Sequence, residues 1–319
     1  MESEVAPRRP SISTLQMTVS TMREAITIAY LLTESNIKGY VQPVTLFALI
    51  SVASSGVTTV DKATFFELAT AVAHASCYIW LYMLHFDSSN QMDPESVKED
   101  TLNKPWRAIP SGKLSIQACK KWYVAATCLL VTSSSLYFGG LPEAVAFMME
   151  TWVYDRVCGA NYWWGKNIIN ALFYATGQLG ATRVAARSMG SAEISRAGYQ
   201  WCALLGLNTL TTIQIQDLRD QQGDRARGRH TMPLVMGDGP TRVITALFVT
   251  LWSVVCPAYW AQGHFTLGFV PSGLIGFLIV LRMLSRRTVE AGRLSWHLYT
   301  LLWLPSLYLT PLLNQFRLY

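Results

Sequence analysis

Residues 217–233, DLRDQQGDRARGRHTMP, directly follow an apolar stretch (196–216) that is long enough to cross a lipid bilayer. Asp217, Asp220 and Asp224 are spaced i, i+3 and i+7, so a helix continuing from this stretch places all three on one face. Carboxylates so close together repel one another unless a cation lies among them. Oxygen ligands of this kind suit Mg²⁺, which commonly takes one or two carboxylates and leaves its other positions to water and phosphate. The competing interpretation is a solvated loop of mixed charge at a membrane surface.

The rest of the chain predicts a membrane-embedded protein. Only 14% of its 319 residues are charged and 51% are hydrophobic, whereas a soluble domain carries about 25% charged residues. Nine segments approach the roughly 20 residues that a spanning helix needs. They are 37–56, 65–88, 116–138, 142–158, 166–187, 196–216, 240–262, 266–284 and 294–313. We therefore predict one all-α domain over residues 1–319, an integral membrane bundle of about nine transmembrane helices.

The N-terminal region is expected to differ from these spans. Residues 16–33 have helical apolar spacing and could form a helix that lies along the membrane interface. Residues 1–15 are polar, and we expect them to form a flexible tail rather than a cleaved signal peptide. The cysteines show no CxxC or Cys/His pairing, which argues against a disulfide framework or a zinc site.

Loop charge predicts the orientation of the bundle. Basic residues collect in alternate connections, in the loops 89–115 and 217–239 and around residues 282–293. The intervening loops near 139–142 and 263–265 have none, although Arg183, Arg187 and Arg196 flank the turn between the fifth and sixth segments. The positive-inside rule then places the N-terminus and the loops 89–115 and 217–239 in the cytosol. The net charge of +6 reflects these loops or an anionic substrate.

A second polar stretch follows the predicted helix 65–88. Residues 85–112 read HFDSSNQMDPESVKEDTLNKPWRAIPSG, with acidic groups first and a proline-bounded basic segment after them. Together with residues 217–233 it gives two acidic clusters at the cytosolic ends of separate helices. Two such clusters facing one cavity could hold a diphosphate through bridging magnesium ions.

These two stretches are similar to the motifs of the UbiA superfamily of intramembrane prenyltransferases. The family's first motif reads Asn-xxx-Asp-xxx-Asp followed by Asn-Lys-Pro-x-Arg-Pro-Ile-Pro-Ser-Gly, and its second reads Asp-xx-Asp-xx-Gly-Asp followed by Gly-xx-Thr-Leu-Pro. The resemblance extends from the second to the ninth predicted helix. It implies a nine-helix bundle that opens laterally to lipid, with Mg²⁺ as cofactor and an isoprenyl diphosphate as substrate.

The first motif departs from the family pattern. Ser96 stands where the middle aspartate is expected, and Asn90 lies ten residues before Asp100 rather than eight. Asp93 precedes Pro94 and Glu95, which is typical of a helix start with Asp93 as the N-cap. Either Asp93, Glu95 or Glu99 replaces the middle ligand, or one ligand is missing; we place Asn90, Glu99 and Asp100 ahead of Asp93 as metal ligands. This variant loop most resembles the fungal UbiA-type terpene cyclases.

A third group of residues supports the predicted site. Tyr162 and Lys166 match the family's Tyr-xxx-Lys pattern, and Asn170 continues the same helical face. By themselves they would suit a membrane interface, where Tyr and Lys are common. Gln214 lies one turn before Asp217, and an aromatic stripe precedes Asn90. These pocket candidates, whose alternative is simple packing, are Tyr78, Tyr82, Phe86, Asn170 and Gln214.

The resemblance implies a definite assignment of roles. The catalytic residues are Asn90, Asp100, Tyr162, Lys166, Asp217, Asp220 and Asp224. The metal ligands are Asn90, Glu99, Asp100, Asp217, Asp220 and Asp224, and the diphosphate contacts are Lys104, Arg107, Lys166, Arg219 and Arg225.

The predicted reaction is Mg²⁺-dependent ionisation of an isoprenyl diphosphate, farnesyl diphosphate by resemblance, followed by cyclisation to a terpene. Prenyl transfer to an aromatic acceptor is the alternative. A non-catalytic transporter is disfavoured, because its charges would be expected near the middle of the bilayer. We expect the lipid bilayer as partner, no nucleic acid and no obligate protein partner. The predicted location is an intracellular membrane of the endoplasmic reticulum type in a fungus.

Overall fold

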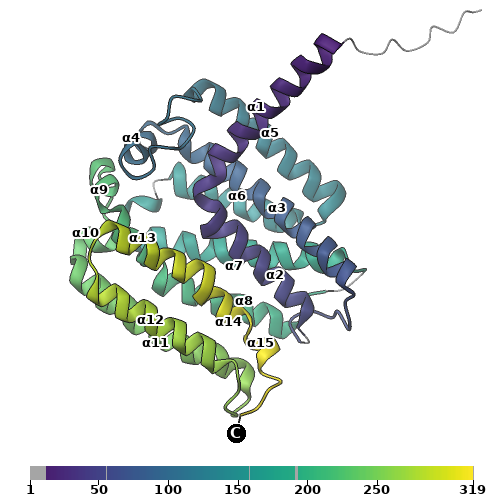
Figure 1. Ribbon diagram of the computed structural model, residues 1–319, viewed down its shortest axis with the longest axis vertical. Helices are drawn as coiled ribbons and strands as arrows, with labels where there is room; N and C mark the ends of the chain where they lie inside the picture. Colours follow the sequence, from purple (N-terminus) through teal and green to yellow (C-terminus); the bar gives the residue numbers. More distant parts are fainter. Residues whose placement is uncertain (1–11, 55, 158, 191–192, 319) are drawn as a thin grey trace, which may run out of the picture.

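The computed structural model describes residues 12–54, 56–157, 159–190 and 193–318, and the fold is all-α (Figure 1). The α-helices are α1 (Ile12–Asn36), α2 (Gln42–Ala53), α3 (Phe65–Gln91), α4 (Pro94–Asn103), α5 (Ile116–Ser133), α6 (Leu141–Asp155), α7 (Trp163–Arg187), α8 (Arg196–Thr212), α9 (Asp217–Arg227), α10 (Met232–Met236), α11 (Asp238–Ala261), α12 (Phe269–Ser285), α13 (Val289–Leu298), α14 (Leu304–Tyr308) and α15 (Thr310–Leu313). Short π-helical turns, η1 (Ile37–Val41), η2 (Ser134–Phe138) and η5 (Tyr299–Trp303), and the 3₁₀ turns η3 (Gly159–Asn161) and η4 (Ile213–Gln216) connect or extend them.

Helix starts follow local capping chemistry. Thr64 begins α3 with a capping box, in which its hydroxyl accepts from the Glu67 backbone and the Glu67 carboxylate accepts from Thr64. Ser115, Ser195 and Thr288 cap α5, α8 and α13 in the same side-chain-to-backbone manner. Each of the nine predicted segments is helical over most of its length, and eight of them contain one main α-helix; the ninth, 294–313, divides into the end of α13, η5, α14 and α15.

The number of helices that cross a membrane is a separate matter. Among the helices in the described ranges, α11 is long and apolar enough to span a membrane by length and composition, and α12 is apolar but shorter. Other predicted spans divide into shorter pieces, as 116–138 does into α5 and η2. The nine-span topology therefore stays a prediction.

The N-terminal helix is continuous with the first predicted span. α1 runs through the π turn η1 into α2 and packs against α3, and its predicted position along the membrane interface stays a prediction. The turn is fixed from α7: the Tyr174 hydroxyl donates to the Gly39 carbonyl, and the Tyr40 hydroxyl donates to the Phe173 carbonyl at 2.5 Å. Of the predicted tail, residues 12–15 belong to α1, and residues 1–11 lie outside the described residues.

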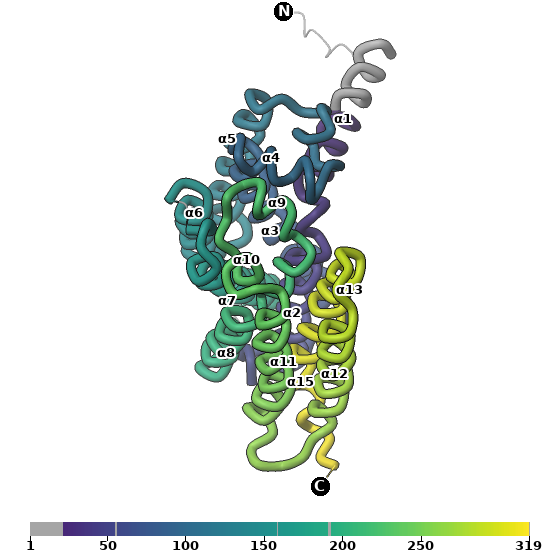
Figure 2. Tube along the Cα trace, turned by 90° about the vertical axis from the view of Figure 1, so that its left-hand side faces the viewer, coloured from purple at the N-terminus to yellow at the C-terminus, as the bar shows by residue number. Residues whose placement is uncertain are grey.

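The short helices α4, α9 and α10 gather at one end of the bundle (Figures 1 and 2). α9 contacts α4, α10 and α13, while the turn between α11 and α12 lies with the C-terminus at the opposite end (Figures 1 and 2). The connecting segments 89–115 and 217–239 thus contain three helices, α4, α9 and α10; the sequence predicted the start of α4 and the helical run from Asp217. The reason is local: Asp93 accepts from the Glu95 backbone with Pro94 in the first turn, and α9 continues from α8 through η4. The prediction of Asp93 as an N-cap is confirmed.

Gly223 sets how closely α9 approaches α4. Its backbone N–H donates to Asn103 Oδ1 at 3.1 Å, and Asn103 Nδ2 donates to the Asp220 carbonyl at 3.0 Å. A Cβ on Gly223 would lie 2.2 Å from Asn103 Nδ2. Asn103 can therefore clamp the two helices only because position 223 has no side chain.

Gly223→Ala is expected to destabilise the protein, although alanine is the better helix former by about 1 kcal/mol. The added methyl group forces Asn103 away and leaves its two hydrogen bonds unmade. Thermal unfolding in detergent measures the effect. Gly273→Ala is the matched control, because a Cβ at Gly273 in α12 meets nothing within 4 Å. Equal melting temperatures for the two variants would contradict the clamp.

Candidate active site

The three aspartates of α9 lie as the spacing predicts, on one helix that begins at Asp217. Asp217 and Asp224 are fully buried, and Asp220 is partly exposed. Asp217 Oδ1 accepts from Lys166 Nζ at 2.5 Å, which joins α9 to the first turn of α7. This contact brings Lys166 and the second acidic motif together, and their common role in a site stays a prediction.

Two arginines that follow the α9 aspartates connect the two acidic motifs. Arg229 Nη1 lies 3.0 Å from Glu99 Oε1 and 3.5 Å from Asp224 Oδ1. Arg227 lies 3.0 Å from Glu99 Oε2 and 3.0 Å from Asp93 Oδ2. Burial alone would raise the pKa of Glu99, but the charges of Arg229, Lys104 and Arg227 lower it to about 2. Glu99 is therefore a charged partner of arginines at neutral pH.

Another arginine, Arg107 in the segment after α4, also pairs with two carboxylates. Its guanidinium donates to Asp100 Oδ2 at 2.8 Å and to Asp87 Oδ1 at 2.9 Å, and all three side chains are buried. Asn36 at the end of α1 also donates to Asp87 Oδ1, at 2.7 Å. The predicted diphosphate contact of Arg107 stays a prediction, because here its charge is shared between two carboxylates.

The acidic residues suit Mg²⁺ in one respect and not in another. No group of three Asp, Glu, His or Cys side chains within the described ranges is arranged to hold a metal ion. Asn90, the third predicted ligand of the first motif, donates to Asp155 at 2.9 Å. However, Asp217 Oδ2 and Asp224 Oδ2 are both buried without a hydrogen-bond partner among the described residues. One carboxylate oxygen on each is thus available to a cation that takes its other ligands from water or phosphate.

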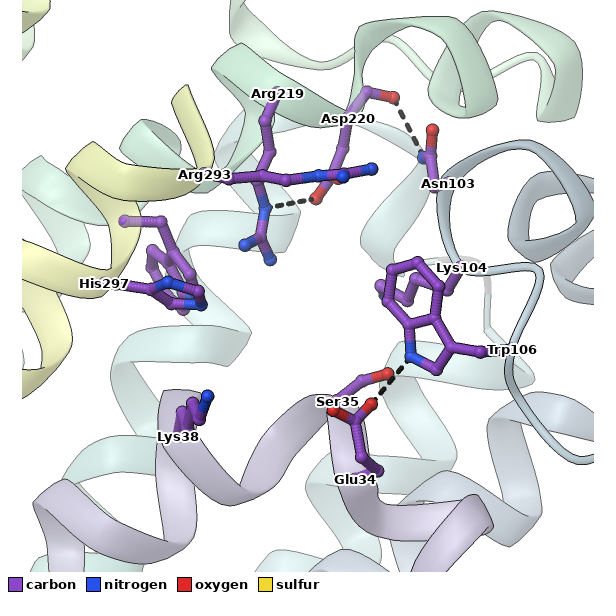
Figure 3. Close-up of a pocket in the computed structure, with 11 residues that line it drawn as sticks. Glu34, Ser35, Lys38, Asn103, Lys104, Trp106, Arg219, Asp220, Arg293 and His297 are labelled. Atoms are coloured by element: carbon purple, nitrogen blue, oxygen red, sulfur yellow. Dashed lines mark hydrogen bonds and ion pairs between the residues drawn. The ribbon is translucent and has the colours of Figure 1, made fainter. Parts of the chain in front are cut away.

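A polar cavity of about 150 Å³ opens beside Asp220 (Figure 3). Figure 3 shows Arg219 and Asp220 on one side of it and Lys104 and Trp106 on another. The lining residues come from α1, η1, the end of α4 and the segment after it, α9 and α13; they are Glu34, Ser35, Lys38, Asn103, Lys104, Trp106, Arg219, Asp220, Arg293, Trp296 and His297. Its basic groups outnumber its two carboxylates, so the cavity suits an anion that arrives with a divalent cation.

An aromatic chamber of about 50 Å³ lies next to the polar cavity. Its walls are Asn36, Gly39, Tyr40, Met83, Phe86, Asn170, Phe173, Tyr174, Ile213, Gln216 and Trp296. Trp296 lines both spaces. The two predicted pocket residues found here are Phe86 and Asn170.

Other predicted pocket residues lie elsewhere. Tyr78 and Tyr82 are completely buried and share a hydrogen bond, and the ring of Tyr82 packs on Phe147 with 4.3 Å between centroids. Gln214 lines an apolar groove between α7, α8, α10 and α11, where it bonds Asn167 and Thr245. For Tyr78 and Tyr82, the packing alternative describes the observed contacts.

Two predicted catalytic or diphosphate residues are exposed. The ring of Tyr162 is exposed and stacks on His230, with 5.3 Å between centroids. Arg225 faces outward from α9, while Arg219 and Lys104 line the polar cavity. Roles for Tyr162 and Arg225 at the diphosphate stay predictions.

Sequence reasoning missed several residues of the site. Arg227 and Arg229 were noted only as loop charges, and Asp87 and Asp155 had no assigned role, although Asp87 begins the stretch that leads to Asn90. Tyr154 places its ring 5.8 Å from the Arg229 guanidinium and 5.3 Å from Phe86. Asp87 and Asp155 could have been found because each is a charged residue inside or beside an apolar segment, which indicates a functional role.

The family pattern of the UbiA prenyltransferases matches residues 41–304, and the chain belongs to this family of membrane proteins. A somaliensene A/B synthase of Streptomyces somaliensis is 28% identical over 251 residues, 76% of this chain and 81% of the relative. The polyprenyl transferase eriF of Hericium erinaceus is 32% identical over 223 residues, 69% of this chain and 74% of the relative. Among solved structures, a UbiA homolog from Archaeoglobus fulgidus bound to DMAPP and Mg²⁺ shares the fold, with a TM-score of 0.58, 13% identity and coverage of 89% of this chain and 98% of that one.

Proposed function

We propose that the protein ionises an isoprenyl diphosphate, farnesyl diphosphate in the first instance, and cyclises the resulting cation to a terpene. The observation that carries the proposal is the pair of adjoining spaces: a polar cavity with Asp220, Arg219 and Lys104, and an aromatic chamber that meets it at Trp296. The first suits the diphosphate and the second suits the hydrocarbon chain. The chamber is smaller than a prenyl chain, so we expect substrate binding to widen it.

The cofactor fits this arrangement. Asp217 and Asp224 would hold Mg²⁺ through their unpartnered oxygens, with Asn90, Glu99, Asp100 and Asp220 as the further proposed ligands. When bound, the ion supplies positive charge that neutralises the leaving diphosphate. The chain's own contribution is positional. Lys166, Arg227 and Arg229 hold the carboxylates in place, and Arg219 and Lys104 donate to the diphosphate.

Charge and solvent exclusion explain the chemistry. Fixed cations stabilise negative charge more strongly as it develops on the diphosphate than in the bound ester, and this difference accelerates carbon–oxygen cleavage. Phe86, Phe173 and Tyr174 keep water from the other side of the breaking bond. With water excluded, the allylic cation can be captured by a double bond of the same prenyl chain.

A second reaction, prenyl transfer to an aromatic acceptor, is favoured by the 32% identity to a polyprenyl transferase. One experiment separates the two reactions. Purified protein is incubated with farnesyl diphosphate and Mg²⁺, with and without an aromatic acceptor, and the products are separated by gas chromatography. A cyclic hydrocarbon without acceptor supports cyclisation, and product only with acceptor supports transfer. Absence of diphosphate release under either condition contradicts both.

Removal of divalent cations is expected to abolish turnover, and added Mg²⁺ is expected to restore it. The reason is that the buried ligands are hard oxygens that prefer this ion to softer metals. Diphosphate release before and after chelation measures the effect, and thermal unfolding of the same samples shows whether the chelated protein is still folded. Full turnover after exhaustive chelation would exclude the metal.

We propose the same membrane orientation that loop charge predicts, with nine spans and with α4 and α9 on the cytosolic side of a fungal endoplasmic-reticulum-type membrane. Support comes from the clustering of α4, α9 and α13 at one end of the bundle. Cysteines introduced at Ser111 and at Gly263 should react from opposite sides of sealed membrane vesicles. Reaction of both from the same side would contradict the orientation.

A further inference from the structure

Trp296 lies between the polar cavity, the proposed site of the diphosphate, and the aromatic chamber, the proposed site of the prenyl chain. It belongs to α13, is 6% exposed, and lines both the polar cavity and the aromatic chamber. The guanidinium carbon of Arg219 lies 5.3 Å from the centroid of its ring. That distance is within the range of about 6 Å over which a cation is attracted to an aromatic face. The structure thus already places one positive charge, the Arg219 guanidinium, over this indole ring.

Neighbouring residues hold the indole in position. A Cβ on Gly39 would lie 3.2 Å from Trp296 Cζ2, so the glycine gives the ring edge its room. Tyr299 stacks on the ring at 5.7 Å between centroids and an interplanar angle of 17°. Because the ring is held on more than one side, its face is oriented before substrate arrives.

We propose that Trp296 is a catalytic residue that stabilises the allylic cation at the entrance to the aromatic chamber. This inference rests on the proposed function. Arg219 covers the indole in the structure and also lies 3.5 Å from Asp220, on the diphosphate side. When Arg219 turns to the diphosphate, it leaves the indole face to the cation. Arg219 thereby stabilises the negative charge of the leaving diphosphate, and the indole of Trp296 stabilises the positive charge of the allylic cation.

The chemistry balances without an added reactant. The carbon–oxygen bond breaks, its electron pair leaves with the diphosphate oxygen, and positive charge spreads over the allylic carbons of the chain. Trp296 lowers the energy of this cation through its electron-rich face and forms no bond to it. A double bond of the same chain then supplies the electrons of the new carbon–carbon bond, and the cyclised cation loses a proton to the released diphosphate.

Fluorinated tryptophans at position 296 test the inference, because ring fluorines weaken the negative face while leaving the shape nearly unchanged. With increasing fluorination, kcat for farnesyl diphosphate is expected to fall stepwise, by roughly 10- to 30-fold in total, while KM changes little. The same replacements at Trp260 are the control, since Trp260 packs against Trp201 and Tyr259 at the far end of α11. A packing role for Trp296 predicts no trend at either position.

Two ordinary substitutions add a product readout. Trp296→Phe should keep part of the rate, and Trp296→Leu should lower kcat further and release more linear farnesol, formed by water capture of an unstabilised cation. Equal rates for the two variants, or an unchanged kcat across the fluorinated series in an active wild type, would overturn the role of Trp296 alone. A wild type that releases no diphosphate overturns the proposed function instead, and the inference with it.

Discussion

Asp224→Asn is expected to lower kcat by at least about 100-fold, the scale seen when one electrostatic contact to a developing charge is removed. Asp224 is fully buried, with one oxygen 3.5 Å from Arg229 and the other without a partner among the described residues. Asparagine keeps the shape but removes the charge that would bind a metal ion. The fold should persist, because Arg229 keeps its 3.0 Å contact with Glu99.

Asp93→Asn is the matched control for this prediction. Asp93 also contacts an arginine, Arg227 at 3.0 Å, but its role is to cap α4. Asparagine caps helices about as well as aspartate, so this variant should keep most of the wild-type rate. Both variants are assayed for diphosphate release over a range of Mg²⁺ concentrations. If Asp93→Asn loses activity and Asp224→Asn keeps it, the assignment of ligands is wrong.

Lys166→Met is expected to abolish turnover and to lower the free energy of unfolding by about 3–5 kcal/mol, the usual consequence of leaving a buried charge without its partner. Lys166 is 4% exposed and Asp217 is fully buried, with 2.5 Å between Nζ and Oδ1. Removing the ammonium leaves the Asp217 carboxylate uncompensated. Thermal unfolding and diphosphate release of the same preparation give the two readouts.

The double variant Lys166→Met with Asp217→Asn separates structure from chemistry. Both charges are then absent, so much of the lost stability should return, whereas turnover should not, because the variant lacks the proposed metal ligand Asp217 and the lysine that holds it. A double variant that recovers activity together with stability would mean that the pair serves the fold alone.

Much of the fold could be predicted because its signals are local. Apolar runs and basic connections predicted helices in nine segments, and Asp93 before Pro94 predicted the start of α4. The continuity of α1 with α2 was missed, because it depends on long-range hydrogen bonds. Tyr40 bonds Phe173 and Tyr174 bonds Gly39, and the partners in each pair are more than 130 positions apart in the sequence. Such long-range contacts leave no periodic pattern in either segment.

In the candidate site, too, local features could be predicted from the sequence and contacts between distant segments could not. The spacing of Asp217, Asp220 and Asp224 predicted their common helix correctly. The pairing of Arg227 and Arg229 with Glu99 was not foreseen, since it arises only when α9 packs on α4. Sequence spacing also cannot tell a chamber wall from a packed core, which is why Tyr78 and Tyr82 were grouped with Phe86. The junction residue Trp296 could be found only from the two cavities it lines.

Diphosphate release from an allylic substrate, compared with its non-allylic counterpart, tests the central claim most directly. Purified protein with Mg²⁺ is given farnesyl diphosphate or 2,3-dihydrofarnesyl diphosphate, whose saturated bond cannot stabilise a cation by resonance. Ionisation predicts rapid release of diphosphate from farnesyl diphosphate and almost none from the dihydro compound. Equal release from both would show direct hydrolysis at phosphorus and contradict ionisation, and no release from either would contradict the proposed function.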